Sequence, residues 1–208
     1  MRKKKFYFVV FEGVEGTGKS YQIEKLYNNL KKKKFDVIKT REPGGSDTAE
    51  KIRNLIFGNK SNKFDKLTDF FLMCASRNEH IKKKLLIAKK QKKIVLCDRF
   101  TDSTYAYQVV GNKINNKLNT VNQKYILKGL SPNLTIVLKS DFKTIFSRIK
   151  KRKKLNKFDK LKISFYKKAQ QTYINKAKNN SKYCVFNSSK DNNDLEKKIF
   201  KFIFNRLK

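Results

Sequence analysis

The stretch FEGVEGTGKS, residues 11 to 20, has the spacing G-x-x-x-x-G-K-S, which is typical of a loop that binds the phosphates of a nucleoside triphosphate. Glycines let backbone N–H groups turn inward around a phosphate, and the start of the following helix adds a partial positive charge. Lys19 would reach the outer phosphates, and the Ser20 hydroxyl could ligate Mg²⁺. A plain glycine-rich turn would explain the glycines but not the Lys-Ser pair. The predicted phosphate-binding residues are Gly13, Val14, Glu15, Gly16, Thr17, Gly18, Lys19 and Ser20.

Two further stretches combine charged side chains with the ends of apolar runs. TREPGG, residues 40 to 45, would place Arg41 and a Pro-Gly-Gly turn at the carboxyl edge of a sheet, where ligands bind in open α/β folds. CDRFTDSTYAYQ, residues 97 to 108, would bring the Asp98 carboxylate near a metal ion and the Arg99 guanidinium beside a phosphate. The structural alternatives are a surface arginine in a turn and a buried Asp-Arg pair.

The elements that must position these residues follow from the hydrophobic pattern. Short, nearly continuous apolar runs are typical of strands buried on both faces, and they span 6–11, 36–40, 93–98, 134–138 and 183–187. Between them, apolar residues recur at helical spacing, most clearly over 23–30, 142–149 and 195–203. Strands that alternate with helices predict an α/β fold of three layers, with a parallel sheet between helices and one domain over residues 1–208.

The charge of the chain is strongly unbalanced, with 52 Lys and Arg against 17 Asp and Glu and a formal net charge of +35. Such a field favours anionic partners but does not determine the fold. The basic residues are spread along the whole chain together with many Asn, Ile and Phe, as a drift of codon usage toward A and T would also produce. Nucleic-acid binding is therefore not expected as the function.

Cysteine usage and hydropathy indicate the compartment. Three isolated cysteines, Cys74, Cys97 and Cys184, are an odd number and are expected to be reduced in a cytoplasmic protein. The apolar run near the start is short and has no small-residue cleavage site after it. No later run is long enough to cross a bilayer, so no membrane association is expected.

The series FEGVEGTGKS, TREPGG, ASRNEH, DRFTDST-AYQ and then SPNLTIVL and NKFDK, in this order and spacing, resembles bacterial thymidylate kinase over nearly the whole chain. The resemblance implies a P-loop nucleoside-monophosphate-kinase fold with a five-stranded parallel sheet. It also implies transfer of the γ-phosphate of ATP to dTMP for dTTP synthesis, with Mg²⁺ as cofactor and a homodimer as the usual assembly.

The resemblance assigns roles by matching position. Glu15 matches an acid that contacts the sugar 3′-hydroxyl, and Tyr107 matches an aromatic near the sugar. Arg77 matches the residue that contacts the thymine carbonyl, next to polar base contacts from Thr104 and Gln108. The arginines expected around the monophosphate are Arg41, Arg53 and Arg99. Asp98 and Ser20 are expected near Mg²⁺, and the implied catalytic residues are Lys19, Asp98, Arg99, Arg152 and Lys157.

Two positions depart from the family pattern. Met73, one helical turn before Arg77, stands where a Phe usually stacks on thymine, and a thioether loses the ring-on-ring interaction. Phe70 and Phe71 nearby are expected in the core. Gly16, by contrast, follows the bacterial pattern at a position where eukaryotic members have a phosphate-loop arginine.

In the predicted basic lid, residues 148–160, Lys157 stands at the place of an arginine that bacterial members supply. Lysine keeps the charge but loses the planar fork. Arg148 and Arg152 lie close by, and the sequence leaves open which cation contacts the transferring phosphate.

Two rival functions remain at this stage. A deoxynucleoside kinase on the same fold would need a base at an acceptor hydroxyl, and the TREPGG turn and the Asp-Arg pair argue against it. A nucleic-acid-binding module would fit the charge, but no recognition motif is visible. Because the acceptor of a monophosphate kinase is already an anion, no general base is required, and the single histidine, His80, is expected as a surface or capping residue.

Overall fold

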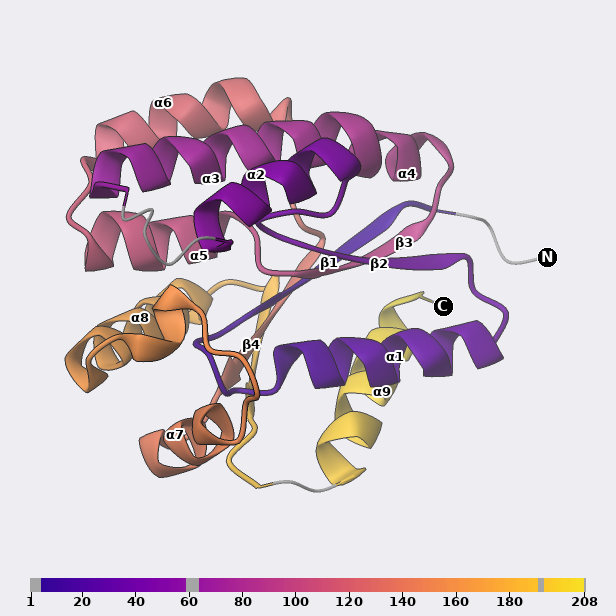
Figure 1. Ribbon diagram of the computed structural model, residues 1–208. Coiled ribbons are helices and arrows are strands. Elements are labelled where there is room, and N and C mark those ends of the chain that lie inside the picture. The colour runs from indigo at the N-terminus through magenta and orange to yellow at the C-terminus, as the bar shows by residue number, and fades with distance from the viewer. Residues whose placement is uncertain (1–4, 59–63, 191–192, 208) are drawn as a thin grey trace.

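The computed structural model describes residues 5–58, 64–190 and 193–207 (Figure 1). Its strands are β1 (Tyr7–Glu12), β2 (Val37–Arg41), β3 (Ile94–Asp98), β4 (Leu134–Lys139) and β5 (Tyr183–Asn187). Its helices are α1 (Lys19–Lys32), α2 (Asp47–Phe57), α3 (Lys66–His80), α4 (Leu86–Lys90), α5 (Thr101–Thr104), α6 (Asn116–Leu127), α7 (Phe142–Lys150), α8 (Ile163–Ala177) and α9 (Asn193–Leu207). Two π-helical segments, η1 (Ile81–Leu85) and η2 (Tyr105–Gly111), and a 3₁₀ turn, η3 (Lys157–Lys160), complete the order.

The five strands form one parallel sheet in the order β2-β3-β1-β4-β5, which confirms the predicted fold. The runs predicted as strands agree with the observed ones to within one residue at each end. In the sheet register, Asp98 at the end of β3 pairs with Arg41 of β2 and Phe11 of β1. The stretches FEGVEGTGKS, TREPGG and CDRFTDSTYAYQ therefore all leave the sheet at the same carboxyl edge.

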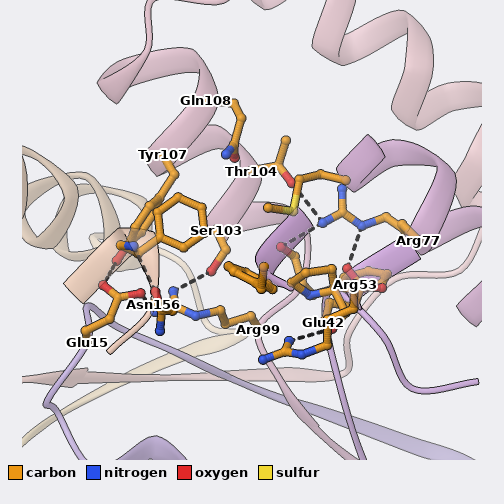
Figure 2. A pocket seen from close by; sticks show the side chains of 15 residues that line it. Glu15, Glu42, Arg53, Arg77, Arg99, Ser103, Thr104, Tyr107, Gln108 and Asn156 are labelled. Carbon is orange, nitrogen blue, oxygen red and sulfur yellow. Dashed lines mark hydrogen bonds and ion pairs between the residues drawn. The ribbon is translucent and has the colours of Figure 1, made fainter. Parts of the chain in front are cut away.

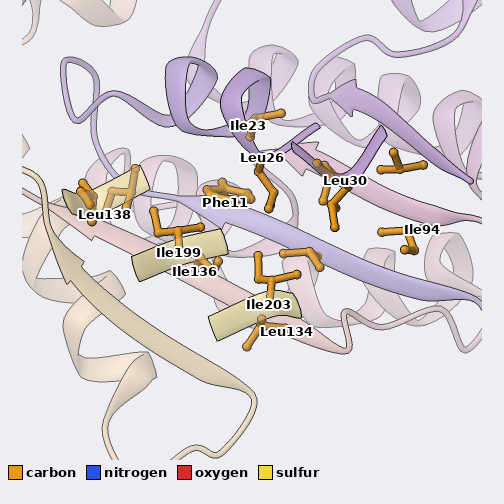
Figure 3. Close-up of a cluster of buried hydrophobic side chains, with 14 residues drawn as sticks. Phe11, Ile23, Leu26, Leu30, Ile94, Leu134, Ile136, Leu138, Ile199 and Ile203 are labelled. Carbon is orange, nitrogen blue, oxygen red and sulfur yellow. The ribbon is translucent and has the colours of Figure 1, made fainter. Parts of the chain in front are cut away.

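Helices cover both faces of the sheet, as Figure 1 shows. Alternating side chains of β1 explain why: Val9 and Phe11 face a buried cluster with α1 and α9, whereas Phe8 and Val10 face a second cluster with η1 and α4. Figure 3 shows the first cluster, in which Ile23, Leu26 and Leu30 of α1 pack against the sheet. The cluster also contains Leu134, Ile136 and Leu138 of β4 and Ile199 and Ile203 of α9. These side chains carry the predicted helical stripes of α1 and α9, so both interpretations are confirmed.

A third buried cluster joins α7, α8 and η2 beside the same carboxyl edge. The stripe predicted over 142–149 lies in α7, with Ile145 and Ile149 buried in this cluster. The predicted lid, 148–160, begins inside α7 and continues to η3. Among the residues that the structure describes, no helix is both long and apolar enough to cross a membrane.

Candidate active site

The phosphate loop connects β1 to α1, and its glycines have the backbone conformations that the motif requires. Gly13 has φ +144° and Gly16 has φ +76°, both in a region that L side chains rarely adopt. A Cβ at Gly13 would lie 2.4 Å from the Leu138 carbonyl oxygen, and one at Gly16 would lie 2.7 Å from that of Ile145. The loop is thus packed closely against β4 and α7, and neither position has room for a side chain.

Lys19 lies inside this loop. Its Nζ donates to the carbonyl oxygens of Gly13 at 2.9 Å and Val14 at 3.0 Å. Burial, with a smaller contribution from the nearby Arg99, lowers the pKa of Lys19 to about 8. A bound phosphate would stabilise the charged ammonium, so the loop is suited to an anion.

Ser20 and Asp98 lie where a phosphate-bound cation would need oxygen ligands. The Ser20 hydroxyl donates to Asp98 Oδ2 at 2.6 Å, which joins the first turn of α1 to the end of β3. Magnesium keeps several waters and binds through one or two protein oxygens plus substrate phosphates. The described residues contain no cluster of three or more His, Cys, Asp or Glu that could hold a metal by itself, and the Ser20–Asp98 pair fits the sparser arrangement.

Arg99 begins the turn after β3 in the left-handed conformation, with φ +71°. This costly geometry for a side-chain-bearing residue returns its guanidinium toward the phosphate loop. Nη2 pairs with Glu15 Oε1 at 2.6 Å, and Nη1 donates to Ser103 Oγ at 2.9 Å and Tyr173 Oη at 3.2 Å. Burial alone would lower the pKa of Arg99, but Glu15 raises it well above its usual value. The guanidinium therefore stays charged inside the protein.

Glu12, at the end of β1, is a site residue that the sequence reasoning missed. Its carboxylate is fully buried and accepts from the Phe100 N–H at 2.8 Å and the Ser103 hydroxyl at 2.6 Å. Burial raises the pKa of Glu12 to about 7, with a further contribution from Asp102. These bonds hold the turn that carries Arg99. The sequence signal that could have identified Glu12 is an acidic residue at the end of a strand that is otherwise apolar on both faces.

Beside the phosphate loop lies a cavity that we call the central pocket. Figure 2 shows its side chains converging from the β1–α1 loop, α2, α3, the segment 99–108 and the lid. It is lined by Glu15, Glu42, Pro43, Arg53, Phe57, Met73, Arg77, Arg99, Phe100, Ser103, Thr104, Tyr107, Gln108, Asn156 and Phe158. All residues predicted to bind dTMP line this pocket except Arg41.

Arg77 is held at one end of the central pocket. Its Nε donates to Glu42 Oε2 at 2.7 Å, and Nη2 donates to the Phe100 carbonyl at 3.0 Å and to Thr104 Oγ1 at 2.8 Å. Burial alone would raise the pKa of Glu42, but Arg77 and His80 lower it below its ordinary value. Arg77 Nη1 is buried and has no hydrogen-bond partner within the described part of the chain. An unpaired buried donor is costly, so Nη1 is suited to an acceptor on a ligand.

A second cavity, the phosphate-loop cavity, adjoins the central pocket. It is lined by Glu15, Gly16, Gly18, Lys19, Ser20, Tyr21, Arg53, Asp98, Arg99, Arg152 and Asn156. Four of these residues also line the central pocket, namely Glu15, Arg53, Arg99 and Asn156. Two ligands could therefore meet at their anionic ends between Arg53 and Arg99.

Two of the predicted cationic side chains, Arg41 and Lys157, line neither the central pocket nor the phosphate-loop cavity. Arg41 is exposed, forms an ion pair with Glu50 at 2.9 Å and lines a different cavity, together with Ser20 and Asp98. Lys157 pairs with Asp69 of α3 at 2.5 Å and lines neither the central pocket nor the phosphate-loop cavity.

The two lid arginines lie nearer the phosphate loop. Arg152 lines the phosphate-loop cavity and pairs with Asp159. Arg148 Nη1 donates to the Gly16 carbonyl oxygen at 3.2 Å. Both arginines therefore approach the triphosphate side from α7 and the lid.

Several residues that line the central pocket were not assigned a role by sequence reasoning. Asn156 lines both cavities and caps η3, and Phe158 packs edge-on against the Tyr107 ring at 5.3 Å. Both lie in NKFDK, so the motif was visible although the roles were not.

The structure corrects two expectations about burial. His80 is not a surface or capping residue: it is completely buried, and its ring pairs with the buried Glu42 carboxylate. Phe70 is in the core as expected, whereas Phe71 is 45% exposed because it lies on the outer side of α3.

A parallel sheet with a phosphate loop at its carboxyl edge, beside a pocket lined by Arg53, Arg77 and Arg99, defines the class as a P-loop phosphotransferase. A family model described as thymidylate kinase matches residues 11–199. The chain therefore belongs to the thymidylate kinase family.

Similar proteins agree with this assignment. The chain is 39% identical over 190 residues to thymidylate kinase from Mycoplasmoides gallisepticum, covering 90% of this chain and 89% of the relative. It is 42% identical over 170 residues to thymidylate kinase from Acholeplasma laidlawii, covering 80% and 83%. A crystal structure of thymidylate kinase from Ehrlichia chaffeensis superposes with a TM-score of 0.77 at 28% identity, covering 96% and 99% of the two chains.

Proposed function

We propose that this chain transfers the γ-phosphate of ATP to dTMP, giving dTDP and ADP, with dTMP in the central pocket and the triphosphate in the phosphate-loop cavity. The observation that carries this assignment is the set of residues that line both cavities, which includes Arg53 and Arg99. Two phosphates bound in these cavities would meet between two guanidinium groups. Phosphoryl transfer needs mainly such positioning and charge neutralisation, and little covalent chemistry from the protein.

The phosphate ends of both substrates are held by cations. Lys19 binds the outer phosphates of ATP from within the loop, and Arg99 neutralises charge between donor and acceptor. Ser20 and Asp98 would hold Mg²⁺, which supplies further charge neutralisation on the phosphates when bound. Arg53 approaches the acceptor phosphate, held by a bond from Nη1 to the Pro43 carbonyl at 2.7 Å and by the Phe57 ring at 4.9 Å.

The base end of the pocket selects thymine. Arg77 Nη1 donates to a carbonyl oxygen of the base, next to polar contacts from Thr104 and Gln108, which are both buried. Met73 packs on the ring face. Glu15, which accepts from the Tyr107 hydroxyl, contacts the sugar hydroxyl. A cytosine presents an amino group where thymine presents a carbonyl, and a guanidinium cannot accept from it.

Arg152 is the lid cation in this proposal. It lines the phosphate-loop cavity, whereas Lys157 is paired with Asp69 of α3. Arginine also offers the planar fork that suits a phosphate. The lysine of the lid then fastens the lid to α3, and the arginine contacts the triphosphate.

The enzyme acts as a homodimer in this proposal. Exposed apolar side chains gather on the neighbouring helices α2, α3 and α6, which lie on one side of the sheet in Figure 1. They are Leu55, Leu67, Phe71, Val121 and Tyr125, the last 75% exposed. A second copy would cover this surface. Light scattering of the protein and of the Tyr125→Lys variant tests it, since the variant should be monomeric.

We also infer a cytoplasmic location. Cys74 and Cys97 are buried and Cys184 is half-buried, and all three are free thiols. Unpaired cysteines are usual where glutathione and thioredoxin keep thiols reduced. ATP and deoxynucleotides are available in the same compartment.

A coupled assay of ADP release with each nucleoside monophosphate in turn tests the function. dTMP should be the best acceptor and dUMP should be weaker by roughly 10- to 200-fold, because one methyl group contributes about 1 to 3 kcal/mol. Thymidine should not be phosphorylated, since the pocket offers arginines for a monophosphate. Equal efficiency with dCMP or GMP, or turnover of thymidine, would contradict the proposal.

A further inference from the structure

We propose that His80 is a positioning residue for base recognition: it fixes the Glu42 carboxylate, and Glu42 fixes Arg77. The inference deepens the function proposed above and rests on the role of Arg77 given there. His80 is the single histidine of the chain and is completely buried, although phosphoryl transfer to an anionic acceptor does not need it. Its bonds lead away from the reacting phosphates and toward the base end of the central pocket.

The bonds form one continuous chain. His80 Nδ1 lies 2.9 Å from Glu42 Oε1, and the other carboxylate oxygen accepts from Arg77 Nε at 2.7 Å. Thr40 Oγ1 lies 2.7 Å from His80 Nε2. Because a carboxylate only accepts, His80 Nδ1 carries a proton and donates to Glu42. Hydrogen bonds therefore join Thr40, His80 and Glu42 in series, and Arg77 occupies the second carboxylate oxygen.

Each oxygen of the buried Glu42 thus has its own donor. A buried carboxylate with only one partner either rotates or takes up a proton, since burial raises its pKa. Either change would release Arg77 Nε. The Arg77 guanidinium is planar, so when Nε moves, the direction of the unpaired Nη1 moves with it. His80 therefore determines where the free donor for the base is directed.

The turn after β2 provides independent support, because it is packed directly against this chain of bonds. A Cβ at Gly45 would lie 2.4 Å from Thr40 Oγ1 and 2.6 Å from His80 Nε2. Gly45 also has φ +93°, a conformation that favours glycine. The second glycine of TREPGG thus leaves room for the bond between Thr40 and His80.

The test compares dTMP and dCMP in five variants. His80→Leu removes both bonds at similar volume and should weaken dTMP binding by about tenfold or more, the effect expected when a bond to a charged group is lost. The KM for ATP and kcat should stay within about twofold, because base binding is similar in the ground state and the transition state. The preference for dTMP over dCMP should fall, and His80→Gln, whose amide N–H can still donate to Glu42, should restore part of it.

A matched pair separates positioning from general stability. Thr40→Val removes the bond from β2 to His80 at the end of α3. Thr48→Val removes a bond of similar length from α2 to the neighbouring residue of α3, from Thr48 to Glu79 at 2.6 Å. Only Thr40→Val should weaken dTMP binding, by about threefold or more. In ¹⁵N-imidazole spectra, the single His80 signal should shift on addition of dTMP and not on addition of an ATP analogue alone.

Two results would overturn the role of His80. One is a folded His80→Leu protein that binds dTMP within twofold of wild type. The other is an equal effect of Thr40→Val and Thr48→Val on dTMP binding. Should His80→Leu not fold, Thr40→Val and His80→Gln decide the matter. If instead Arg77→Leu leaves the preference for dTMP unchanged, the proposed role of Arg77 fails, and this outcome is distinct from failure of His80 alone.

Discussion

The phosphate loop is one unbroken stretch, Gly13 to Ser20. The central pocket instead draws its side chains from the β1–α1 loop, the turn after β2, α2, α3, the segment 99–108 and the lid. The loop presents backbone groups and a single cation. The pocket presents side chains that are aligned by other side chains, as Glu42 aligns Arg77 and Glu12 aligns the turn before Ser103.

This difference has a physical consequence. A ligand in the loop depends on few groups that cannot be replaced, so a single change there should remove function. A ligand in the pocket depends on many contacts that are each moderate, so single changes should produce graded losses of affinity or selectivity.

The largest effect is expected at Lys19. Lys19→Ala should abolish nearly all turnover while the protein stays folded, because Nζ hydrogen-bonds only to loop carbonyls among the residues that the structure describes. Steady-state assays and circular dichroism check the two halves of this prediction. A folded variant with substantial activity would show that the loop is not the triphosphate site.

The next largest effect is expected in the lid. Arg152→Gln should lower kcat by about a hundredfold, because a donor to developing phosphate charge is lost. The matched variant Lys157→Gln should keep kcat within about twofold and lower thermal stability slightly, through the loss of the contact with Asp69. A large fall in kcat for Lys157→Gln instead would make Lys157 the lid cation.

At the base end, Arg77→Leu should raise the KM for dTMP by roughly 10- to 100-fold with a smaller change in kcat, and should reduce the preference over dCMP. The control is the KM for ATP, which should not change because Arg77 does not line the phosphate-loop cavity. Equal changes in both KM values would indicate a general loss of structure.

The pH dependence should distinguish the two regions. Burial lowers the pKa of Lys19 to about 8, so its ammonium loses its charge as the pH rises through that value. The kcat/KM for ATP should fall about tenfold per pH unit above it. The kcat/KM for dTMP at saturating ATP should fall only at higher pH, because a bound triphosphate stabilises the ammonium. Identical profiles for both substrates would exclude this origin.

The smallest effect is expected at Met73, which lines the central pocket. Met73→Phe should lower the KM for dTMP by roughly 2- to 12-fold, because ring stacking contributes about 0.5 to 1.5 kcal/mol, and kcat should change little. Met73→Leu, which adds no ring, should give no gain. If Met73→Phe abolishes activity, Met73 does not face the base.

Pattern alone predicted much of this protein. The five strands, their parallel arrangement and the helices over 23–30, 142–149 and 195–203 follow from local hydrophobic periodicity, which the burial of the core confirms. The phosphate loop was predictable because its function depends on contiguous backbone, and its residues are therefore adjacent in the sequence.

Only the tertiary structure decided the rest. Nothing local indicates that Glu12 is buried under the turn after β3 or that Lys157 pairs with Asp69, since each contact joins residues about ninety positions apart. His80 looked like a polar residue at a helix end, but α3 packs that end against the turn after β2 and buries it on Glu42. A side chain's role depends on which other groups compete for its hydrogen bonds, and those groups are brought together by the folded chain.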